Sequence, residues 1–231
     1  MARSKEDVCA ALSSKKIQRL YDFLSPIYDL LTRYESGSLR RAIDIADVEP
    51  SFKVLEVGFG TGRTLPELIK RAGEKGGVHG LDISPKMTER ASRKIKRHGL
   101  SERVHLVIGD AENLPFSDSS FNLVFSSYLL DLVDAKVIPN VLSEFKRVLR
   151  PDGRLVIVSL SRGSKWWDNM RPYEWIYEMS PSLLGGCRPI SVKPYIAKAG
   201  FKSIHHELIH SGHLMPTEIT LVKNTHHKST L

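Results

Sequence analysis

The 231-residue sequence has little cysteine and no long hydrophobic run. Its two cysteines, Cys9 and Cys187, lie far apart and lack the spacing of a metal site, so they favour free thiols in a reducing compartment over a disulfide framework. No stretch approaches the roughly 20 apolar residues that a membrane-spanning helix needs, and residues 1–10 contain no apolar signal core. We therefore expect a cytoplasmic protein and leave open a peripheral association with a membrane surface.

The composition is typical of a globular domain, with 41% hydrophobic and 26% charged residues. The formal net charge of +8 is compatible with a nucleic acid, an anionic lipid or an acidic substrate as partner. The densest basic run, from Lys86 to Arg97, has the pattern of a solvent-exposed helix face. We therefore expect a small-molecule partner and no nucleic acid.

The first 50 residues have apolar positions at three- and four-residue spacing, which predicts helices over residues 15–33 and 39–47. Ser25 and Pro26 interrupt the first of these, with the serine as N-cap and the proline as first residue of a second helix. From residue 53 onward, short apolar strands alternate with helices, which indicates crossover units and a parallel sheet. The expected strands are 53–57, 78–81, 104–108, 122–125, 154–160, 202–209 and 217–222, and the expected helices are 64–71, 85–98, 135–149 and 192–199.

We therefore predict an α/β fold with a doubly wound, mostly parallel, seven-stranded sheet of the Rossmann-like kind. The last two alternating runs are expected to form a hairpin that adds an antiparallel edge to this sheet. Residues 1–50 would form an N-terminal helical cap, and residues 51–231 would form the ligand-binding domain. Within that domain, residues 161–190 break the alternation and are expected to form a lid over the substrate.

A glycine-rich turn follows the first strand, in the segment Val54-Leu55-Glu56-Val57-Gly58-Phe59-Gly60-Thr61-Gly62. Glycines at a strand-to-helix turn let a ligand approach the backbone closely. The dinucleotide fingerprint has a glycine where this chain has Arg63, and the carboxylate of Glu56 would repel a pyrophosphate. The same carboxylate suits a ligand that carries an ammonium and a sulfonium group, and S-adenosylmethionine is such a ligand.

Acidic residues follow the next two strands, at the edge where open α/β sheets bind ligands. Asp82 is placed to accept hydrogen bonds from both ribose hydroxyls of a nucleoside. Asp110 is placed to accept a hydrogen bond from the adenine amine, and the backbone NH of Ala111 to serve a ring nitrogen. The alternative is that each acid only caps its neighbouring helix. The spacing of the whole set favours a cofactor pocket.

Four motifs, at these positions and in this order, resemble the class I S-adenosylmethionine-dependent methyltransferases. They are VLEVGFGTG at 54–62, GLDIS at 80–84, GDAENLPFSDSSFNLVFSS at 109–127 and LRPDGRLVIVS at 149–159. Within that superfamily the chain is most similar to the ubiquinone/menaquinone biosynthesis C-methyltransferases, whose tyrosine–aspartate motif resembles residues 28–33. The resemblance implies S-adenosylmethionine as the cofactor. The predicted cofactor-binding residues are Glu56, Gly58, Gly60, Thr61, Gly62, Asp82, Ile83, Asp110, Ala111 and Ser127.

The sequence leaves the methyl acceptor open between two classes. The quinone family has a histidine and a tryptophan that are missing from residues 36–41, and an arginine of its substrate pocket aligns with Asp131. The chain also resembles bacterial phosphatidylethanolamine N-methyltransferases, which share the pattern of residues 25–29. We predict methyl transfer to a small lipophilic acceptor of the quinone-precursor type, with phospholipid N-methylation as the alternative.

Two alternatives come from other functional classes. One is a protein that binds S-adenosylmethionine without catalysis, and the other is a nicotinamide-dependent oxidoreductase on a similar fold. Glu56 and Arg63 argue against the oxidoreductase, because neither suits the dinucleotide fingerprint.

Four residues are candidates for catalysis. Tyr21 and Tyr28 are placed either to close over the cofactor sulfonium or to pack one amphipathic helix. Tyr128 and Asp131 follow the fourth strand, where a general base would act on a carbon acceptor. No metal is expected, because methyl transfer from a sulfonium depends on alignment and a dry site.

The predicted lid contains all three tryptophans, Trp166, Trp167 and Trp175. Such a cluster suits a bulky apolar acceptor, or it forms a small satellite core under a long insertion. Basic residues flank the cluster, which is a pattern that can hold a protein on anionic lipid.

Residues 206–210 match the H-E-x-x-H motif of zinc hydrolases, which requires a helix. Here the alternation of apolar residues predicts a strand, on which His206 and His210 would lie roughly 13 Å apart at ~3.3 Å per residue. Two such histidines cannot both reach one zinc ion, since Zn–N bonds are about 2.0–2.1 Å long. We therefore predict no metal site at this motif.

Overall fold

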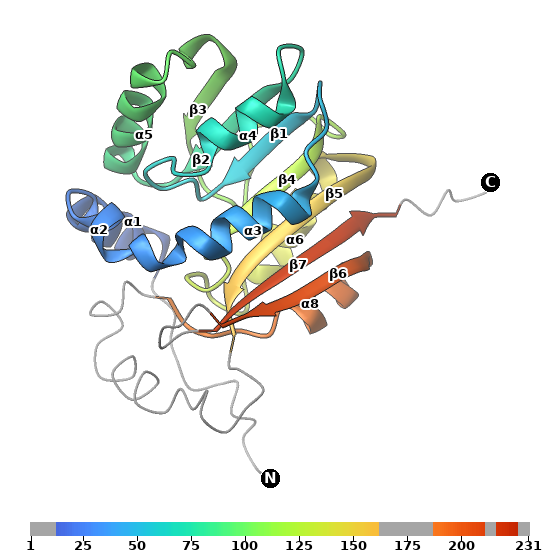
Figure 1. Ribbon diagram of the computed structural model, residues 1–231. Helices are drawn as coiled ribbons and strands as arrows, with labels where there is room; N and C mark the ends of the chain where they lie inside the picture. Colours follow the sequence, from blue (N-terminus) through green and yellow to red (C-terminus); the bar gives the residue numbers. More distant parts are fainter. Residues whose placement is uncertain (1–12, 162–186, 211–215, 226–231) are drawn as a thin grey trace.

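The computed structural model describes residues 13–161, 187–210 and 216–225 (Figure 1). Its centre is a seven-stranded sheet with the order β3-β2-β1-β4-β5-β7-β6. Neighbouring strands from β3 to β5 pair in parallel, whereas β7 pairs antiparallel with both β5 and β6. The predicted doubly wound sheet with an antiparallel C-terminal hairpin is confirmed. The strands are β1 (Lys53–Val57), β2 (Gly77–Asp82), β3 (Val104–Ile108), β4 (Phe121–Ser127), β5 (Leu149–Leu160), β6 (Phe201–Ile209) and β7 (Thr217–Asn224).

Helices cover both faces of the sheet (Figure 1). One face carries α3, α4 and α5, and the other carries α6 and α8. Strand β1 illustrates the division: Val54 packs in the first core, while Leu55 and Val57 pack in the second, because successive side chains of a strand point to opposite faces. The helices are α3 (Ser36–Ala46), α4 (Leu65–Ala72), α5 (Pro85–Arg97), α6 (Ile138–Val148) and α8 (Lys193–Lys198).

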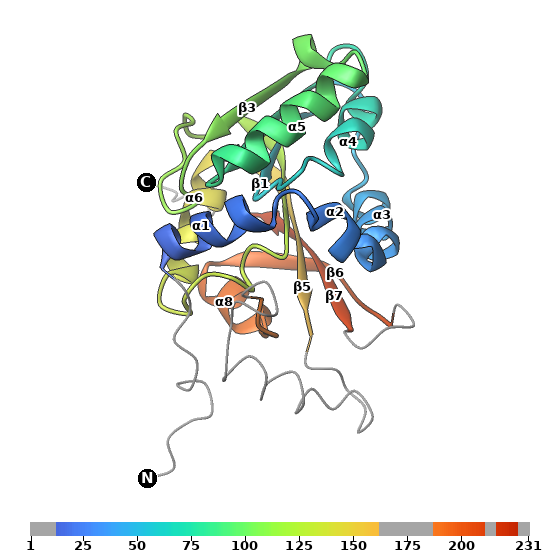
Figure 2. The ribbon, with the colours of Figure 1, turned by 90° about the vertical axis from the view of Figure 1, so that its left-hand side faces the viewer.

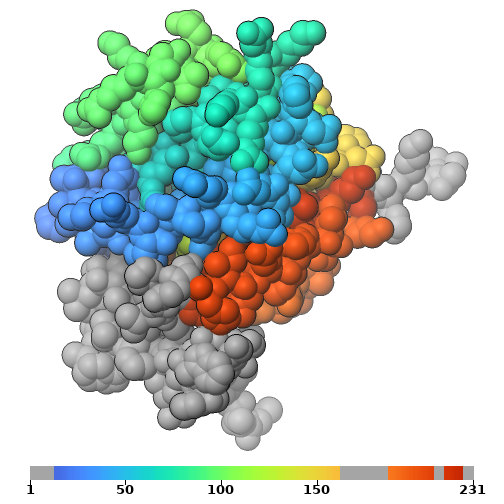
Figure 3. Space-filling view, in the orientation of Figure 1, coloured from blue at the N-terminus to red at the C-terminus, as the bar shows by residue number. Residues whose placement is uncertain are grey.

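The N-terminal cap consists of α1 (Ser14–Leu24), α2 (Tyr28–Leu31), the short 3-10 helix η2 (Arg33–Glu35) and α3. Figure 2 shows α1 and α2 beneath α5, and in Figure 3 these blue segments form a band below the green α5. Ile17 is the one fully buried residue of α1, and α2 has none. Contacts other than a large apolar interface must therefore hold α1 and α2 in place.

Polar links from the cap to α5 provide that attachment. The Asp22 carboxylate accepts hydrogen bonds from the Ser84 hydroxyl at 2.6 Å and from the Lys86 backbone NH at 3.2 Å. The Lys94 ammonium lies 3.2 Å from the Asp29 carboxylate. The start of α5 is itself well defined, because Ser84 caps the helix by accepting from the Met87 NH.

The second N-terminal helix differs from the prediction. It begins at Tyr28, not at Pro26, and it is a single turn long. Thr32 ends it with a φ of −100° and a ψ of 14°, outside the helical region, while its hydroxyl bonds to the Tyr28 carbonyl. The cap therefore turns sharply at this point instead of running on as one long helix.

Strand β5 begins five residues earlier than predicted. Leu149 pairs with Phe121, and the next pair is Arg154 with Leu123, so the strand contains an irregular segment. Asp152 in that segment has a φ of +64°, which fits the turn that the sequence indicates there. The regular pairing starts at Arg154, where the strand was expected to begin.

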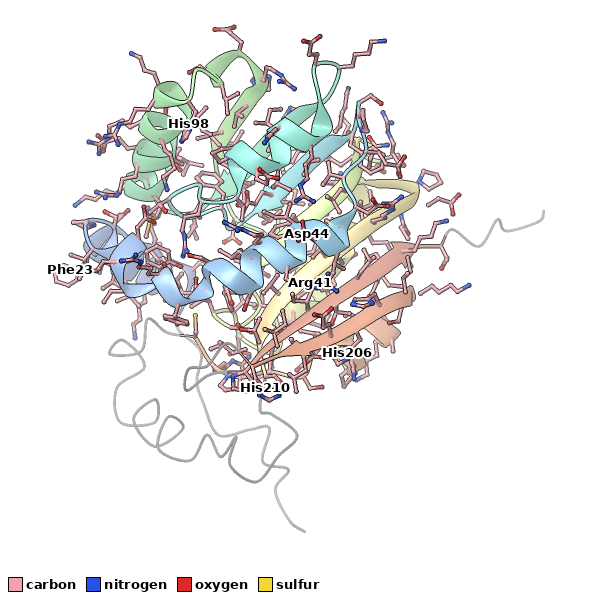
Figure 4. All side chains as sticks on the ribbon, viewed as in Figure 1. Phe23, Arg41, Asp44, His98, His206 and His210 are labelled. Atoms are coloured by element: carbon pink, nitrogen blue, oxygen red, sulfur yellow. The ribbon has the colours of Figure 1, made fainter. Side chains whose placement is uncertain are left out.

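No helix in the described ranges is long and apolar enough to cross a bilayer. The segment with the H-E-x-x-H motif lies on β6 and is a strand, as predicted. The Arg41 guanidinium of α3 donates to the Glu207 carboxylate at 2.8 Å, and the His206 ring contacts the carboxylate of Glu218 on β7. Figure 4 shows His206 and His210 at separate places along this edge of the sheet.

Gly62, at the end of the glycine loop, packs tightly against two helices, so its replacement tests that packing. Its φ is +70°, and a Cβ there would lie 2.9 Å from both the Ala91 Cβ and the Leu65 Cδ1. We expect Gly62→Ala to lower the free energy of unfolding by about 2–5 kcal/mol, since left-handed strain adds to overpacking. Urea unfolding measures the change.

Gly99→Ala is the matched control, because Gly99 has a φ of +68° but no atom within 4 Å of its added Cβ. This variant has the backbone strain without the overpacking, and its free energy of unfolding should fall by about 1–2 kcal/mol. Equal losses in the two variants would show that the packing of Gly62 contributes nothing.

Candidate active site

A cavity of about 690 Å³, including its open mouth, lies at the carboxyl ends of β1, β2, β3 and β4. This is where the strand order reverses, the usual ligand site of an open α/β sheet. Tyr21 of α1 and Tyr28 of α2 line it from the cap. A smaller cavity adjoins it, and the two share the lining residues Tyr28, Gly58, Gly60, Ser127 and Tyr128.

Nine of the ten predicted cofactor-binding residues line these two cavities. Gly62 lines neither, because it packs against α4 and α5. The smaller cavity adds Glu56 and Thr61 to the set. The larger cavity is lined by Gly58, Gly60, Asp82, Ile83, Asp110, Ala111 and Ser127.

Two backbone NH groups of the glycine loop donate hydrogen bonds to the end of β2. Gly58, with a φ of +78°, donates its NH to the Leu81 carbonyl at 2.7 Å. Gly60, with a φ of +54°, donates its NH to the Asp82 carboxylate at 2.8 Å. The nearest atom to an added Cβ on Gly60 would be a ring carbon of Tyr28, 3.7 Å away. The backbone at Gly60 can therefore meet a ligand in van der Waals contact.

Asp82 has both a structural role and free acceptor capacity. One carboxylate oxygen accepts from Gly60 and the other accepts from the Ser84 NH at 2.9 Å, so the acid anchors the residue that caps α5. Burial raises the pKa of Asp82 to about 6, which leaves it mostly ionised at neutral pH. An ionised carboxylate has about four acceptor sites, so two hydroxyl groups of a ligand can still bind here.

Glu56 is one of two buried acids that line the smaller cavity. It is 1% exposed, and one of its oxygens accepts from the Thr64 hydroxyl. The other oxygen, Oε2, has no hydrogen-bond partner in the described part of the chain. Burial, with repulsion from Asp82, raises the pKa of Glu56 to about 8. A cation bound beside it would supply the missing partner and favour the ionised form.

Glu35 and Arg63 also line the smaller cavity. The sequence did not predict that these two residues pair with each other. Glu35, at the end of η2, lies 3.5 Å from the Arg63 guanidinium. Arg63 also donates to the Thr32 carbonyl at 2.7 Å and to the Ser36 hydroxyl at 2.6 Å. Burial raises the pKa of Glu35 to about 7. Acids and one guanidinium in a single small cavity suit a zwitterionic group, such as the amino-acid end of S-adenosylmethionine.

The cap brings Tyr21 and Tyr28 together, as their helical spacing indicated. Their ring centroids are 5.6 Å apart and the rings are tilted by 51°. Burial raises the pKa of both phenols, so both stay neutral. Asp29, within the tyrosine–aspartate motif, accepts a hydrogen bond from the Thr61 hydroxyl of the glycine loop. The motif therefore links the cap directly to this loop.

Tyr128 follows β4 with a φ of +55°, a strained conformation for a bulky residue. Its backbone NH donates to the Val158 carbonyl at 2.7 Å, and its hydroxyl lies 3.2 Å from the Thr217 hydroxyl. These contacts to β5 and β7 maintain the strain and turn the residue toward both cavities. Strain of this kind is typical of functional positions.

Asp131 lines neither cavity and is fully buried. Its carboxylate accepts from the Leu160 NH at 2.8 Å, and its backbone carbonyl accepts from the Arg188 NH at 2.9 Å. Burial raises its pKa well above the ordinary range. This placement does not suit a general base. Asp131 instead fastens the two ends of the segment that lies between residues 161 and 187.

The aromatic cluster of the predicted lid, Trp166, Trp167 and Trp175, lies outside the described residues. Within the described ranges, no group of three or more His, Cys, Asp and Glu residues could hold a metal ion.

Comparison with known proteins identifies the family. The methyltransferase-domain family matches residues 54–153. The ubiquinone/menaquinone biosynthesis C-methyltransferase UbiE of Paraburkholderia phymatum is 33% identical over 169 residues, which are 71% of this chain and 67% of that protein. The chain belongs to the class I S-adenosylmethionine-dependent methyltransferases. Its cofactor is S-adenosylmethionine, and the acids that line the two cavities suit the positive charge of that ligand.

The alignments span 58% to 67% of the length of such curated relatives. Solved structures share the fold at lower identity. The cyclase SpnF has a TM-score of 0.74 at 16% identity, covering 93% of this chain and 98% of its own. A SAM-dependent methyltransferase from Aquifex aeolicus has a TM-score of 0.64 at 22% identity, covering 93% of this chain and 100% of its own. Because one neighbour is a cyclase, the fold alone does not decide the reaction.

Replacing Asp82 tests the nucleoside end of the site. Asp82→Ala should weaken S-adenosylmethionine binding by roughly 1.5–3 kcal/mol, the scale of hydrogen bonds to a charged group. Isothermal titration calorimetry measures the loss, with the surface variant Asp118→Ala as control. Unchanged binding by Asp82→Ala would remove this residue from the cofactor site.

The pKa of Glu56 makes cofactor binding depend on pH. An ammonium beside Glu56 would favour the carboxylate and lower its pKa, so binding should release a proton at a pH between that lowered pKa and about 8. The affinity for S-adenosylhomocysteine should therefore fall as the pH drops from 8 to 6, by up to roughly tenfold per unit. Calorimetry in buffers of different ionisation enthalpy measures the released proton.

Glu56→Gln is the control for this titration, since the amide cannot ionise and the amine of the ligand titrates identically in both experiments. The variant should bind more weakly at pH 8 and show the shallower pH dependence. The same pH dependence in both proteins would mean that Glu56 does not meet the ammonium.

Proposed function

We propose that this chain transfers the methyl group of S-adenosylmethionine to a small lipophilic acceptor of the quinone-precursor type. The observation that carries the proposal is the apolar wall of the larger cavity, beside the acids that suit the nucleoside. The names of the curated relatives, which refer to ubiquinone and menaquinone biosynthesis, support the same class of acceptor. The wall consists of Ile17, Leu129, Leu132 and Val133.

The proposed orientation of the cofactor follows from the charges in the two cavities. Asp82 would hold the ribose, and Asp110 and Ala111 the adenine, in the larger cavity. The free Oε2 of Glu56 would accept from the ammonium in the smaller cavity, and the Arg63 guanidinium would meet the carboxylate. The sulfonium would then lie where the two cavities join.

Tyr28 and Tyr128 both line the two cavities, and we place Tyr28 over this junction because it reaches the site from the cap. When bound, the cofactor supplies a methyl group on a positively charged sulfur. A neutral tyrosine offers an aromatic face to that charge, and Tyr21 beside it helps to exclude water. Alignment and a dry environment then supply most of the rate, without a covalent intermediate.

We also propose that residues 1–50 act as a cap on a methyltransferase domain of residues 51–231, and that residues 161–190 cover the acceptor. The fastening of this segment at Asp131 supports the second point. A lipophilic acceptor further implies that the protein meets a membrane surface, where such acceptors reside.

The acceptor class can be tested with methyl-labelled S-adenosylmethionine. The purified protein is incubated with an organic extract of cells, with the water-soluble small molecules, and with protein plus nucleic acid. We expect label in the organic fraction only, on a quinone precursor that chromatography separates from phospholipids. Asp82→Ala serves as the control for transfer that depends on the cofactor site.

Other outcomes each overturn a different part of the proposal. Label on a phospholipid amine would favour the phospholipid N-methyltransferase. Label in the water-soluble or macromolecular fraction would contradict a lipophilic acceptor. Cofactor binding without transfer to any fraction would favour a protein that binds S-adenosylmethionine without methylating.

A further inference from the structure

The cap exposes an unusual concentration of large apolar side chains. Of the seven large hydrophobic residues that are exposed in the described ranges, five lie within residues 23–34. Phe23 is 78% exposed and Leu30 is 72% exposed. Exposed apolar residues that occur singly are ordinary, but a cluster marks a contact surface. We call Phe23, Ile27, Leu30 and Leu31 the cap tip.

The cap tip is the outer side of the helices whose inner side forms the site. Ile17, Tyr21 and Tyr28 line the larger cavity, whereas Phe23 points away from the protein (Figure 4). Ile27, Leu30 and Leu31 share one side of α2, because residues three and four apart are neighbours on a helix. A surface that covers the cap tip would therefore lie directly outside the wall of the active site.

A strongly basic helix flanks the cap tip. Helix α5 carries six Lys and Arg residues and one Glu, and that Glu89 already pairs with Arg93 at 3.3 Å. The acids of α1 and α2 are already paired, since Asp22 bonds to Ser84 and Asp29 to Lys94. Figure 4 shows nitrogen-tipped side chains of α5 on the same flank as Phe23. We call the exposed residues Lys86, Arg93, Lys96 and Arg97 the basic flank.

We propose that the cap tip and the basic flank together dock this protein on an anionic phospholipid bilayer. The inference rests on the proposed function, because a lipophilic acceptor is a reason for the protein to bind a membrane. Binding to vesicles can nevertheless be measured without any methyl transfer. Apolar side chains of an amphipathic segment insert at the boundary of headgroups and acyl chains, while neighbouring cations meet the anionic headgroups. Docked in this way, the active-site wall formed by Tyr21 and Tyr28 faces the membrane.

The shape of the cap tip favours a bilayer over a folded protein partner. Phe23 belongs to α1, Leu30 and Leu31 belong to α2, and Ile27 lies in the turn between the two helices. None of the four lines either cavity of the site. A projecting apolar surface inserts into a soft apolar medium without needing a matching pocket. The surrounding positive charge selects for anionic lipid.

Vesicle flotation tests the proposal on the full-length protein. Vesicles of phosphatidylcholine are compared with vesicles that also contain phosphatidylglycerol, at low and high salt. We expect binding to the anionic vesicles only, weakened by salt because the basic flank is exposed. Phe23→Ser with Leu30→Ser should lower the partition coefficient roughly tenfold or more, since each side chain loses its burial in lipid.

Matched controls come from the opposite edge of the sheet. Ile204→Ser removes an apolar side chain that is 52% exposed on β6 and should leave flotation unchanged. Lys96→Gln with Arg97→Gln should weaken binding roughly thirtyfold, at about 1 kcal/mol per charge. Lys198→Gln with Lys202→Gln, on α8 and β6, should change it little. Thermal unfolding and S-adenosylhomocysteine binding should be unaltered in every variant.

Four results would overturn the proposal. One is the absence of flotation with anionic vesicles, and another is equal flotation with neutral vesicles. The third is equal binding by the cap-tip variant and Ile204→Ser, which would place the contact elsewhere. A change of oligomeric state in the cap-tip variant alone would assign the surface to a second copy of the chain. None of these results depends on the acceptor, so they leave the proposed methyl transfer to its own test.

Discussion

The carboxylate of Asp82 is the interaction on which the site depends. One oxygen holds the Gly60 NH and the other holds the Ser84 NH, so a single side chain joins the glycine loop to the start of α5. Ser84 in turn donates its hydroxyl to Asp22 of the cap. The carboxylate of Asp82 therefore connects the glycine loop, α5 and the cap through hydrogen bonds. The same residue positions the backbone that surrounds a ligand bound to it.

Buried acids also determine which ligands the site accepts. Glu35, Glu56 and Asp82 all have raised pKa values, because burial disfavours their charged forms. A cation relieves that cost, whereas a pyrophosphate would add to it. The same strand-to-helix geometry that serves dinucleotides elsewhere is thus converted to a site for a positively charged cofactor. The selectivity comes from desolvated carboxyl groups rather than from the shape of the fold.

The sequence predicted the sheet, because strand periodicity and glycine turns are local signals, and it predicted the acids at the strand ends for the same reason. It did not predict the pairing of Arg63 with Glu35, nor the fastening role of Asp131, because such contacts join segments that only the folded chain brings together. The single-turn length of α2 was missed as well: the apolar spacing continues past Ser25 and Pro26, but the backbone turns at Thr32.

The hydrogen bonds at Asp131 separate the stretch between Leu160 and Arg188 from the rest of the protein, so that the two parts can change in sequence at different rates. Leu160 and Arg188 are both bonded to this residue, so the chain between them leaves and returns at one fixed point. The entropy of closing such a loop rises by only about 0.6 kcal/mol for each doubling of its length. Insertions and exchanges in this stretch therefore leave the sheet and the nucleoside pocket almost untouched. Evolution, or a protein engineer, can replace this stretch as a module while keeping the same sheet and glycine loop.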